Sequence, residues 1–327
     1  MRCLNKKERI ARMNELAMNN TPYLFIINYE GTKAYVEPLK DIHPEEMMFC
    51  FGEQNNIPLH PSFCTDEVEW QFTSPDRRQY QKSFDWVQKN ENMGNSYLVN
   101  LTCKVPVTTN LSLRDIFLRS KAPYRLWIKH QLVCFSPESF VRVERGIISS
   151  YPMKGTLSAL LPEAEKCLME DAKEAAEHAT IVDLIRNDLS RVAEEVCVPR
   201  YRYVEKLETN CGPILQTSSE IQGKLQSFYL EHPGDMLEQL LPAGSITGAP
   251  KPKTMQIIQE AENYDRDFYT GVMGIWKDGN IDSAVMIRFI DEADGQFFYK
   301  AGGGITAKSD AEKEYNEVIE KVYVPFC

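Results

Sequence analysis

The sequence predicts an α+β fold in which large antiparallel sheets are packed together and covered by helices. The clearest strands come in hairpins, one over Phe140–Tyr151 and another over Tyr23–Val36, and a β-meander begins at Phe268. Helical segments lie between these groups, and no Pro/Gly/Ser-rich linker, repeat or low-complexity segment divides the 327 residues. We therefore expect a single domain over residues 1–327.

Composition limits the classes of function. With 43% hydrophobic residues the chain can form a sizeable core, and its net charge of −10 argues against nucleic acid or an anionic membrane as the main partner. An acidic protein must bind an anionic metabolite through local basic residues, helix N-termini or a metal. The chain has no apolar run of the roughly 18 residues that a membrane span needs, and the N-terminus lacks a secretory apolar core. Nine scattered cysteines without close pairs favour free thiols in a reducing cytoplasm.

The outer elements follow from periodicity and turn residues. Residues 1–20 are predicted to form an amphipathic surface helix, and residues 43–72 give no clear assignment. The remaining expectations before residue 135 are a hairpin about Glu30–Gly31, a helix over Asp76–Met93 ending at Gly94, and buried strands over Ser96–Val107 and Arg125–Phe135.

The central hairpin places two chemically useful groups near each other. Strands Phe140–Glu144 and Ile147–Tyr151 fold at Arg145–Gly146, with Glu138 just before the first strand and Lys154 just after the second. A general acid and an amine nucleophile could therefore face one substrate. The alternative is a salt bridge on the rim of the sheet.

A long helix is predicted over Pro162–Leu189, and it carries Glu174 and Glu177 three residues apart on one face. Like charges at this spacing repel and do not stabilise the helix. They form either a solvated acidic face or part of a site for a divalent cation. The end of the helix has charges that could form a buried network: Asp183, Arg186 and Asp188.

Leu240–Met255 contains glycines and small residues that lead into a helix with Pro252 in its first turn. Free backbone N–H groups there could receive a carboxylate or phosphate, although the spacing is not that of a Walker loop. In the β-meander, Arg288 lies in the apolar run Ile281–Ile290 and needs a carboxylate or an anionic ligand as partner. Gly302–Gly304 permits close backbone approach.

The last helix is predicted to begin with a capping box formed by Ser309 and Glu312. Glu314 and Glu317 repeat the three-residue carboxylate spacing. Two such pairs on two helices could enclose Mg²⁺, a hard cation that prefers carboxylate and water oxygens.

Four ordered motifs resemble the chorismate-utilising enzymes, and among them component I of the aminodeoxychorismate synthases: SPESF…PMKGT, AEHATIVDLIRNDLSRV, GSITGAPK and AGGGITAKSDAEKEYNEV. The resemblance implies a chorismate-binding catalytic core over residues 96–327, packed as in that family, with residues 1–95 as a loosely matching, shortened N-terminal part. Some larger members bind tryptophan in that part, and we expect this chain to lack the pocket.

The resemblance also implies a mechanism. A lysine in the PxKGT motif distinguishes aminodeoxychorismate synthases from anthranilate synthases, which have alanine there. Lys154 would attack C2 of chorismate while the C4 hydroxyl leaves, protonated by Glu138; ammonia would then enter at C4 and expel the lysine. This chemistry predicts a lowered pKa for Lys154 and a protonated Glu138 near neutral pH.

Further site residues come from the same resemblance. Glu177 and Glu317 match Mg²⁺ ligands, with Glu174 and Glu314 beside them. The positions that match substrate contacts are Thr247, Tyr269, Arg288, Gly302, Gly303 and Gly304. The chain departs from the family at Gln216, where a histidine is common, and at Leu98, where a glutamine or lysine is usual. Leu98 argues against water as the nucleophile.

We thus expect an enzyme that makes aminodeoxychorismate for p-aminobenzoate and folate synthesis, with ammonia supplied by a partner glutamine amidotransferase. Two alternatives remain at this stage. One is component I of anthranilate synthase, against which Lys154 counts. The other is a catalytically silent chorismate-binding subunit, suggested by Leu98 and Gln216.

Overall fold

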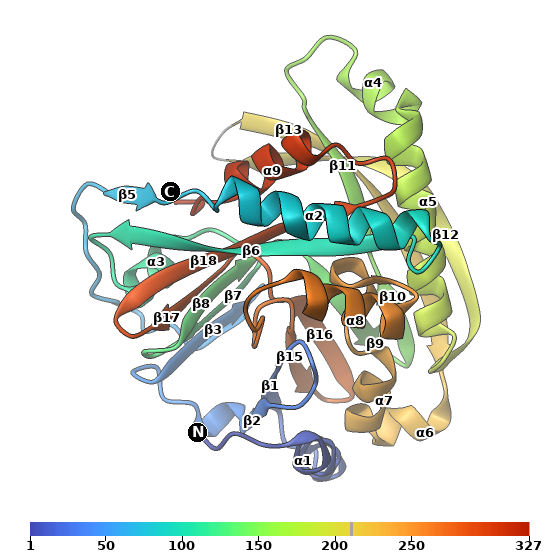
Figure 1. The fold of residues 1–327 in the computed structure, drawn as a ribbon. Coiled ribbons are helices and arrows are strands. Elements are labelled where there is room, and N and C mark those ends of the chain that lie inside the picture. The colour runs from blue at the N-terminus through green and yellow to red at the C-terminus, as the bar shows by residue number, and fades with distance from the viewer. Residues whose placement is uncertain (210–211, 327) are drawn as a thin grey trace.

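The computed structural model describes residues 1–209 and 212–326, and it confirms the predicted α+β class (Figure 1). Within those residues the strands form two antiparallel sheets of nine strands each. Helices cover the outer surfaces, and the main core lies where the sheets and helices meet.

Sheet A has the order β11-β13-β10-β9-β16-β15-β1-β2, with β12 on the other side of β13. Its strands are β1 Tyr23–Ile27, β2 Ala34–Pro38, β9 Ser139–Glu144, β10 Ile147–Ser150, β11 Met153–Ser158, β12 Ala193–Thr209, β13 Gly212–Leu225, β15 Val272–Lys277 and β16 Asn280–Val285. Both predicted hairpins, β1–β2 and β9–β10, are confirmed.

Sheet B has the order β14-β6-β18-β17-β8-β7-β3-β4, with β5 paired to β6. Its strands are β3 Met47–Phe51, β4 Gln54–Asn55, β5 Trp70–Phe72, β6 Leu98–Thr109, β7 Tyr124–Ile128, β8 Leu132–Ser136, β14 Gly248–Ala249, β17 Phe289–Ala293 and β18 Gln296–Ile305. β6 and β18 form the longest ladder of this sheet, in register from Phe297 opposite Val107 to Ile305 opposite Val99.

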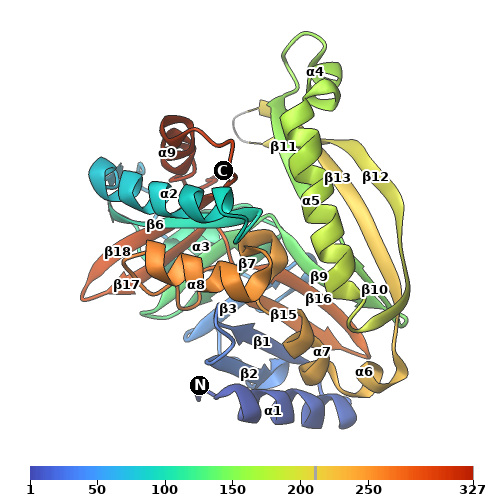
Figure 2. The same cartoon turned by 45° about the vertical axis from the view of Figure 1, so that its right-hand side comes forward.

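The helices lie around the outside of the two sheets (Figures 1 and 2). They are α1 Lys6–Met18, α2 Arg77–Asn92, α3 Leu113–Arg119, α4 Ala164–Glu170, α5 Ala172–Leu189, α6 Ser227–Glu231, α7 Pro233–Leu240, α8 Lys251–Ala261 and α9 Ala311–Glu320, with short 3₁₀ turns η1 Leu39–Asp41 and η2 Gly244–Ile246. Helices α2, α8 and α9 lie on sheet B beside β6 and β18, α1 packs on α7, and α5 runs along β12 and β13.

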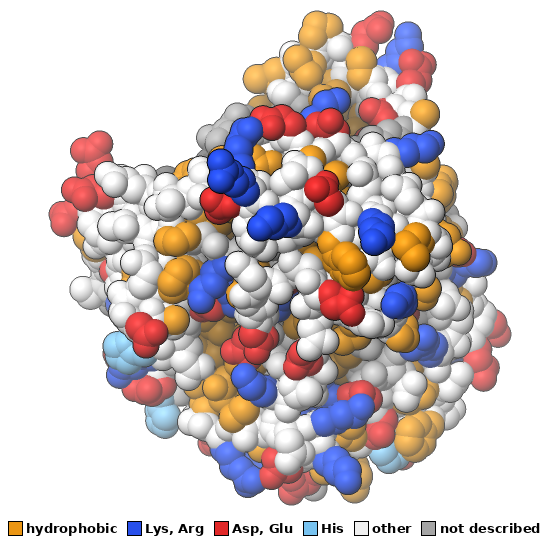
Figure 3. All heavy atoms as spheres, in the orientation of Figure 1, with side chains coloured by type: hydrophobic (Ala, Val, Ile, Leu, Met, Phe, Trp, Pro, Cys, Tyr) orange, Lys and Arg blue, Asp and Glu red, His pale blue; other side chains and the backbone are white. Residues whose placement is uncertain are grey.

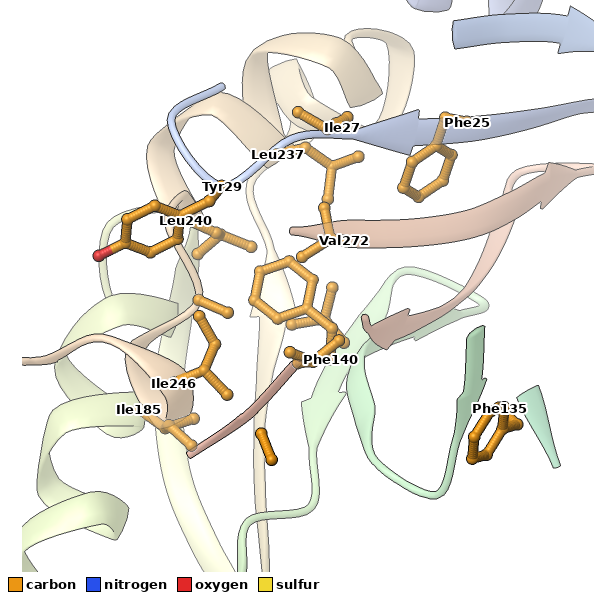
Figure 4. Packing of buried hydrophobic residues seen from close by; sticks show 14 of the residues in the cluster. Phe25, Ile27, Tyr29, Phe135, Phe140, Ile185, Leu237, Leu240, Ile246 and Val272 are labelled. Atoms are coloured by element: carbon orange, nitrogen blue, oxygen red, sulfur yellow. The ribbon is translucent and has the colours of Figure 1, made fainter. Parts of the chain in front are cut away.

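A cluster of buried apolar side chains fixes the backbone near the predicted acid Glu138 (Figure 4). Phe140 of β9 lies among side chains from both sheet A and the helical side of the molecule: Val272, Ile246, Leu240 and Ile185. These residues are at most 8% exposed. Dense apolar packing of this kind restricts backbone movement, so the segment that begins β9 is held in place.

Two predicted helix features are wrong. The helix over Pro162–Leu189 is broken at Asp171, which instead caps α5 by accepting a hydrogen bond from Glu174 N. The capping residue of α9 is Asp310 rather than Ser309. The Ser309 hydroxyl donates to Glu314 at 2.8 Å. In both places a neighbouring aspartate competes for the cap, and aspartate is among the best capping residues.

Two strand predictions also need correction, and one unassigned region is now assigned. Arg125–Phe135 is two strands, β7 and β8, joined by a turn in which His130 has φ 55°. Ile281–Ile290 is likewise two strands, because the chain leaves β16 of sheet A and enters β17 of sheet B. Residues 43–72, which gave no assignment, contain β3, and all five of its residues are buried.

Charges are mixed over the face seen in Figure 3, where acidic and basic side chains alternate. In the described part of the chain, no helix has the length and apolar character that crossing a membrane requires. Seven cysteines there are unpaired, and Cys211 and Cys327 lie outside the described residues.

Candidate active site

The chain passes between the two sheets twice at neighbouring points, and predicted site residues lie at both. Glu138 lies between β8 and β9, and Arg288 lies between β16 and β17 with φ 53°. Backbone hydrogen bonds link the two passages. Val285 N of β16 donates to Glu138 O at 3.1 Å, and Phe135 N of β8 donates to Arg288 O at 3.0 Å. We call these two linked passages the seam. The prediction that Arg288 lies within a strand is therefore wrong, because Arg288 lies between β16 and β17.

Lys154 lies in β11, which continues β10 along β13 after a break at Pro152. Gly155 has φ +72° and produces a bulge between Lys154 and Thr156. Glycine suits this position because the left-handed backbone is costly for other residues. A Cβ there would also approach Glu174 Oε2 and Leu168 Cδ1 to 3.2 Å. The bulge thus permits close packing of β11 against α4 and α5.

The Lys154 amine is ion-paired with Glu177 at 2.8 Å, and its side chain is 27% exposed. Burial works to lower the pKa of Lys154, but the negative charges of Glu177, Glu174 and Glu317 outweigh it and raise the pKa above the usual range. The predicted lowering of this pKa is therefore wrong for the protein without a cation. The physical reason is that these glutamates were considered only as metal ligands, and not as partners of the lysine.

Glu138 accepts a hydrogen bond from the Ser245 hydroxyl at 2.5 Å. Burial raises the pKa of the Glu138 carboxyl, and the hydrogen bond from Ser245 and the charge of Lys154 oppose this only in part. The direction agrees with the prediction that this group holds a proton more readily than an ordinary glutamate. Glu138 and Ser245 line a small cavity together with Ser150, Pro152 and Asp188.

The glycines of β18 bring the lysine and the second glutamate pair together. A Cβ on Gly304 would lie 3.1 Å from Leu98 Cδ1 and 3.5 Å from Lys154 Nζ. A Cβ on Gly303 would lie 3.5 Å from Glu314 Oε2 and 3.6 Å from Glu317 Oε1. The glycines leave the space beside both groups open, and at Gly304 a side chain would also crowd Leu98. Leu98 places an apolar surface beside the amine.

The donor set fits a hard divalent cation. Glu177 and Glu174 of α5 and Glu317 of α9 all raise the pKa of Lys154, so carboxylates from both helices act on one positive charge. Glycine leaves space in front of Glu314 and Glu317, and carboxylate oxygens are the ligands that Mg²⁺ prefers. Among the described residues, no group of three or more His, Cys, Asp or Glu is already arranged as a metal site. The glutamates lie as two pairs, one on α5 and one on α9, and a bound cation would have to bring the two pairs closer together.

The other predicted substrate residues lie around this centre in different ways. The Thr247 hydroxyl is buried and donates to Ala243 O at 2.8 Å. Tyr269 is buried against Phe289, with ring centroids 5.8 Å apart. The Arg288 guanidinium lies 5.6 Å from the centre of the Tyr323 ring. Gln216 lies in β13 opposite Thr156, one residue beyond Lys154's partner in the ladder, Thr217.

The charged network predicted at the end of α5 is only partly present. Arg186 and Asp183 form an exposed pair, whereas Asp188 is buried and pairs with Lys251 at 2.6 Å. The Lys251 amine also donates to Leu240 O at 2.9 Å. Sequence reasoning missed both this pair and Ser245. Lys251 and Ser245 lie in the GSITGAPK motif, for which only the backbone N–H groups were considered as a possible anion site.

Comparison with known proteins identifies the family of the chain. The profile of the family described as chorismate binding enzyme matches residues 10–326. The chain belongs to this family. A Haemophilus influenzae relative described as an uncharacterized PabA-like protein is 46% identical over 318 residues, covering 97% of this chain and 96% of that protein. Aminodeoxychorismate synthase component 1 of Escherichia coli is 34% identical over 269 residues, covering 78% of this chain but 58% of that protein.

Solved structures of the chorismate binding enzyme family share the fold. The menaquinone-specific isochorismate synthase of Escherichia coli superposes with a TM-score of 0.76 over 98% of this chain and 82% of that chain, at 16% identity. Anthranilate synthase component I of Streptococcus pneumoniae superposes with a TM-score of 0.67 over 80% of this chain and 60% of that chain, at 26% identity. The described residues thus share their two-sheet architecture with proteins named isochorismate synthase and anthranilate synthase.

Proposed function

We propose that this chorismate binding enzyme is an aminodeoxychorismate synthase component I, which converts chorismate and ammonia to 4-amino-4-deoxychorismate. The observation that carries the proposal is the position of Lys154. Its amine is ion-paired with Glu177, lies 3.5 Å from the position of a Cβ on Gly304, and has its pKa raised by carboxylates of both α5 and α9. An amine at the centre of the site provides a nitrogen nucleophile. The 34% identity with the Escherichia coli synthase supports the same reaction.

The proposed reaction has two stages. The neutral Lys154 amine forms a bond to C2 of chorismate, the ring double bonds shift, and the C4–O bond breaks. Glu138 gives its proton to the departing hydroxyl, which leaves as water, and becomes a carboxylate. Ammonia then bonds to C4, the double bonds shift back, and the C2–N bond to Lys154 breaks. Ammonia would come from free ammonium or from a partner glutamine amidotransferase.

A Mg²⁺ ion would be held by Glu177 and Glu317, with Glu174 and Glu314 bound directly or through water, and it would supply a positive charge for a substrate carboxylate. Lys154 must lose its proton before it can attack. Neutralising the glutamates removes the charges that raise the pKa of Lys154, so the neutral amine becomes more abundant. Arg288 can bind a second carboxylate with two parallel hydrogen bonds.

Removal of divalent cations is expected to stop turnover, because Lys154 then remains paired with Glu177 and protonated. Adding Mg²⁺ after treatment with EDTA should restore the rate. The measurement is product formation, with thermal unfolding of the treated protein as a control for loss of structure. Turnover that continues at an undiminished rate in EDTA would contradict a role for the cation.

Replacing Glu138 with glutamine is expected to lower kcat by about 100-fold or more, the usual range for loss of a general acid. Glutamine has nearly the same shape and still accepts a hydrogen bond from Ser245, but it has no acidic proton to give. Steady-state kinetics with ammonium as the nitrogen source would measure the change. A kcat within a few-fold of the unsubstituted protein would exclude Glu138 as the acid.

Product identity tests the proposed function directly. The purified protein would be incubated with chorismate, Mg²⁺ and ammonium at mildly alkaline pH, and the products separated with and without aminodeoxychorismate lyase. The proposal expects p-aminobenzoate only when the lyase is present. Formation of anthranilate or isochorismate would identify a different reaction on the same fold. Absence of any product with ammonium and with an added amidotransferase partner would favour a silent chorismate-binding subunit.

A further inference from the structure

The Glu138 carboxyl group has one oxygen already engaged. Ser245 Oγ donates a hydrogen bond to Oε1 at 2.5 Å. A serine hydroxyl has a single proton to donate, and here it is directed at the carboxylate. A proton carried by Glu138 is therefore best placed on the other oxygen, Oε2.

Ser245 is fixed by contacts on both sides of its 3₁₀ turn. Before it, Gly244 lies against α5 so closely that a Cβ would approach Asp188 Oδ2 and Leu184 Cδ2 to 3.0 Å. After it, Thr247 Oγ1 donates to Ala243 O at 2.8 Å and closes the turn on itself. A donor held in this way does not need to be ordered anew in each catalytic cycle, which is the condition for efficient electrostatic assistance.

The buried pair Asp188–Lys251 holds the same segment at its two ends. Lys251 Nζ lies 2.6 Å from Asp188 Oδ2 and donates to Leu240 O at 2.9 Å. The side chains of Lys251 and Asp188 are 8% and 9% exposed. This contact ties the end of α7 and the start of α8 to α5, so the residues between them, including Ser245, have little freedom to move away from Glu138.

We propose that Ser245 is a positioning residue of this site, whose hydroxyl holds Glu138 Oε1 so that Oε2 delivers the proton to the departing substrate hydroxyl. The inference rests on the proposed function, and it adds a residue that the proposed mechanism does not require. In the step itself the proton passes from Glu138 Oε2 to the leaving oxygen, and the new carboxylate keeps the Ser245 hydrogen bond. Ser245 retains its own proton.

The hydrogen bond should also set how readily Glu138 gives up its proton, because a donor to the ionised form lowers the pKa of a carboxyl group. The other charged groups that face Glu138 are Lys154 of β11, Arg288 of the seam, Lys321 after α9 and Asp188 of α5. A change from serine to alanine leaves all of these in place. Its effect on Glu138 can therefore be assigned to the lost hydroxyl.

The test compares Ser245→Ala with Ser245→Thr and with a matched control, Ser150→Ala. Ser150 lines the same cavity, but its hydroxyl donates to Phe140 O at 2.9 Å and not to Glu138. In Ser245→Ala, the limb of the kcat profile that falls at high pH should shift to a higher pH by about one unit. The value of kcat should drop about tenfold, and KM should change less than about twofold. Threonine retains the hydroxyl and should restore both. Ser150→Ala should leave the limb in place.

The same shift should be seen without turnover. The ¹³C NMR signal of the Glu138 carboxyl, in protein labelled at glutamate side-chain carbons and assigned by its loss in Glu138→Gln, reports the pKa directly. An unchanged pKa in Ser245→Ala, or an equal shift in Ser150→Ala, would overturn the proposal. If the unsubstituted protein makes no aminodeoxychorismate while the NMR shift is present, the proposed function fails and the role of Ser245 toward Glu138 stands.

Discussion

Replacing Lys154 with alanine is expected to reduce formation of aminodeoxychorismate by roughly 1,000-fold or more, since removing a covalent nucleophile commonly costs at least that much. The alanine side chain cannot form the bond to C2, and ammonia would have to attack C4 without it. The substitution also removes the ion pair with Glu177, so thermal unfolding of the variant is compared with that of the unsubstituted protein. Product analysis with ammonium and Mg²⁺ measures the loss.

A matched control is available on the neighbouring strand. Lys224 of β13 is an exposed lysine in the same sheet, and Lys224→Ala should retain the rate of the unsubstituted protein. If Lys154→Ala turned over at an undiminished rate, the covalent step would be excluded. If it produced anthranilate instead, the lysine would be directing the position of amination rather than providing the nucleophile.

Replacing Lys251 with methionine is expected to lower the free energy of unfolding by about 3–5 kcal/mol, the usual result of leaving one member of a buried ion pair uncompensated. Methionine has a similar length, so the loss would come from the unpaired Asp188 carboxylate and the unsatisfied Leu240 carbonyl. Urea unfolding followed by circular dichroism gives the difference, provided that the slopes of the transitions agree.

Lys253 serves as the control for this substitution, because it lies in the first turns of the same helix and donates only to the Gln256 side chain among the described contacts. Lys253→Met should change the free energy of unfolding by less than about 0.5 kcal/mol. Combining Lys251→Met with Asp188→Asn removes both charges and should recover a large part of the loss. A single Lys251→Met protein as stable as the original would mean that the pair does not stabilise the segment that holds Ser245.

Local patterns in the sequence predicted much of the fold. Turn residues such as Arg145–Gly146 and Glu30–Gly31 determine hairpins through neighbours in the chain, and both hairpins are present. The errors came where tertiary contacts decide. An apolar run such as Ile281–Ile290 reads as one strand, and nothing local shows that it crosses between sheets at Arg288. The break before α5 depended on one aspartate.

For the site, the residues could be predicted from the sequence but the contacts between them could not. The motifs identified Glu138, Lys154 and the glutamates. In the structure the Lys154 amine is ion-paired with Glu177, and Glu174 and Glu317 also raise its pKa. Pairwise relations could not be read from the sequence. Lys154 and Glu177 are 23 positions apart, Ser245 and Glu138 are 107 apart, and the effect of each pair on protonation depends on distances set by packing. The roles of Thr247, Tyr269 and Gln216 toward substrate remain predictions.

The seam affects how the molecule can accommodate a substrate. Glu138 and Arg288 lie on two adjacent crossings that are hydrogen-bonded to each other and continue into both ladders, β8–β17 and β9–β16. A hinge at this place would have to break backbone hydrogen bonds in two sheets at once. Glu138 and Arg288 should therefore keep their relative positions when a substrate binds.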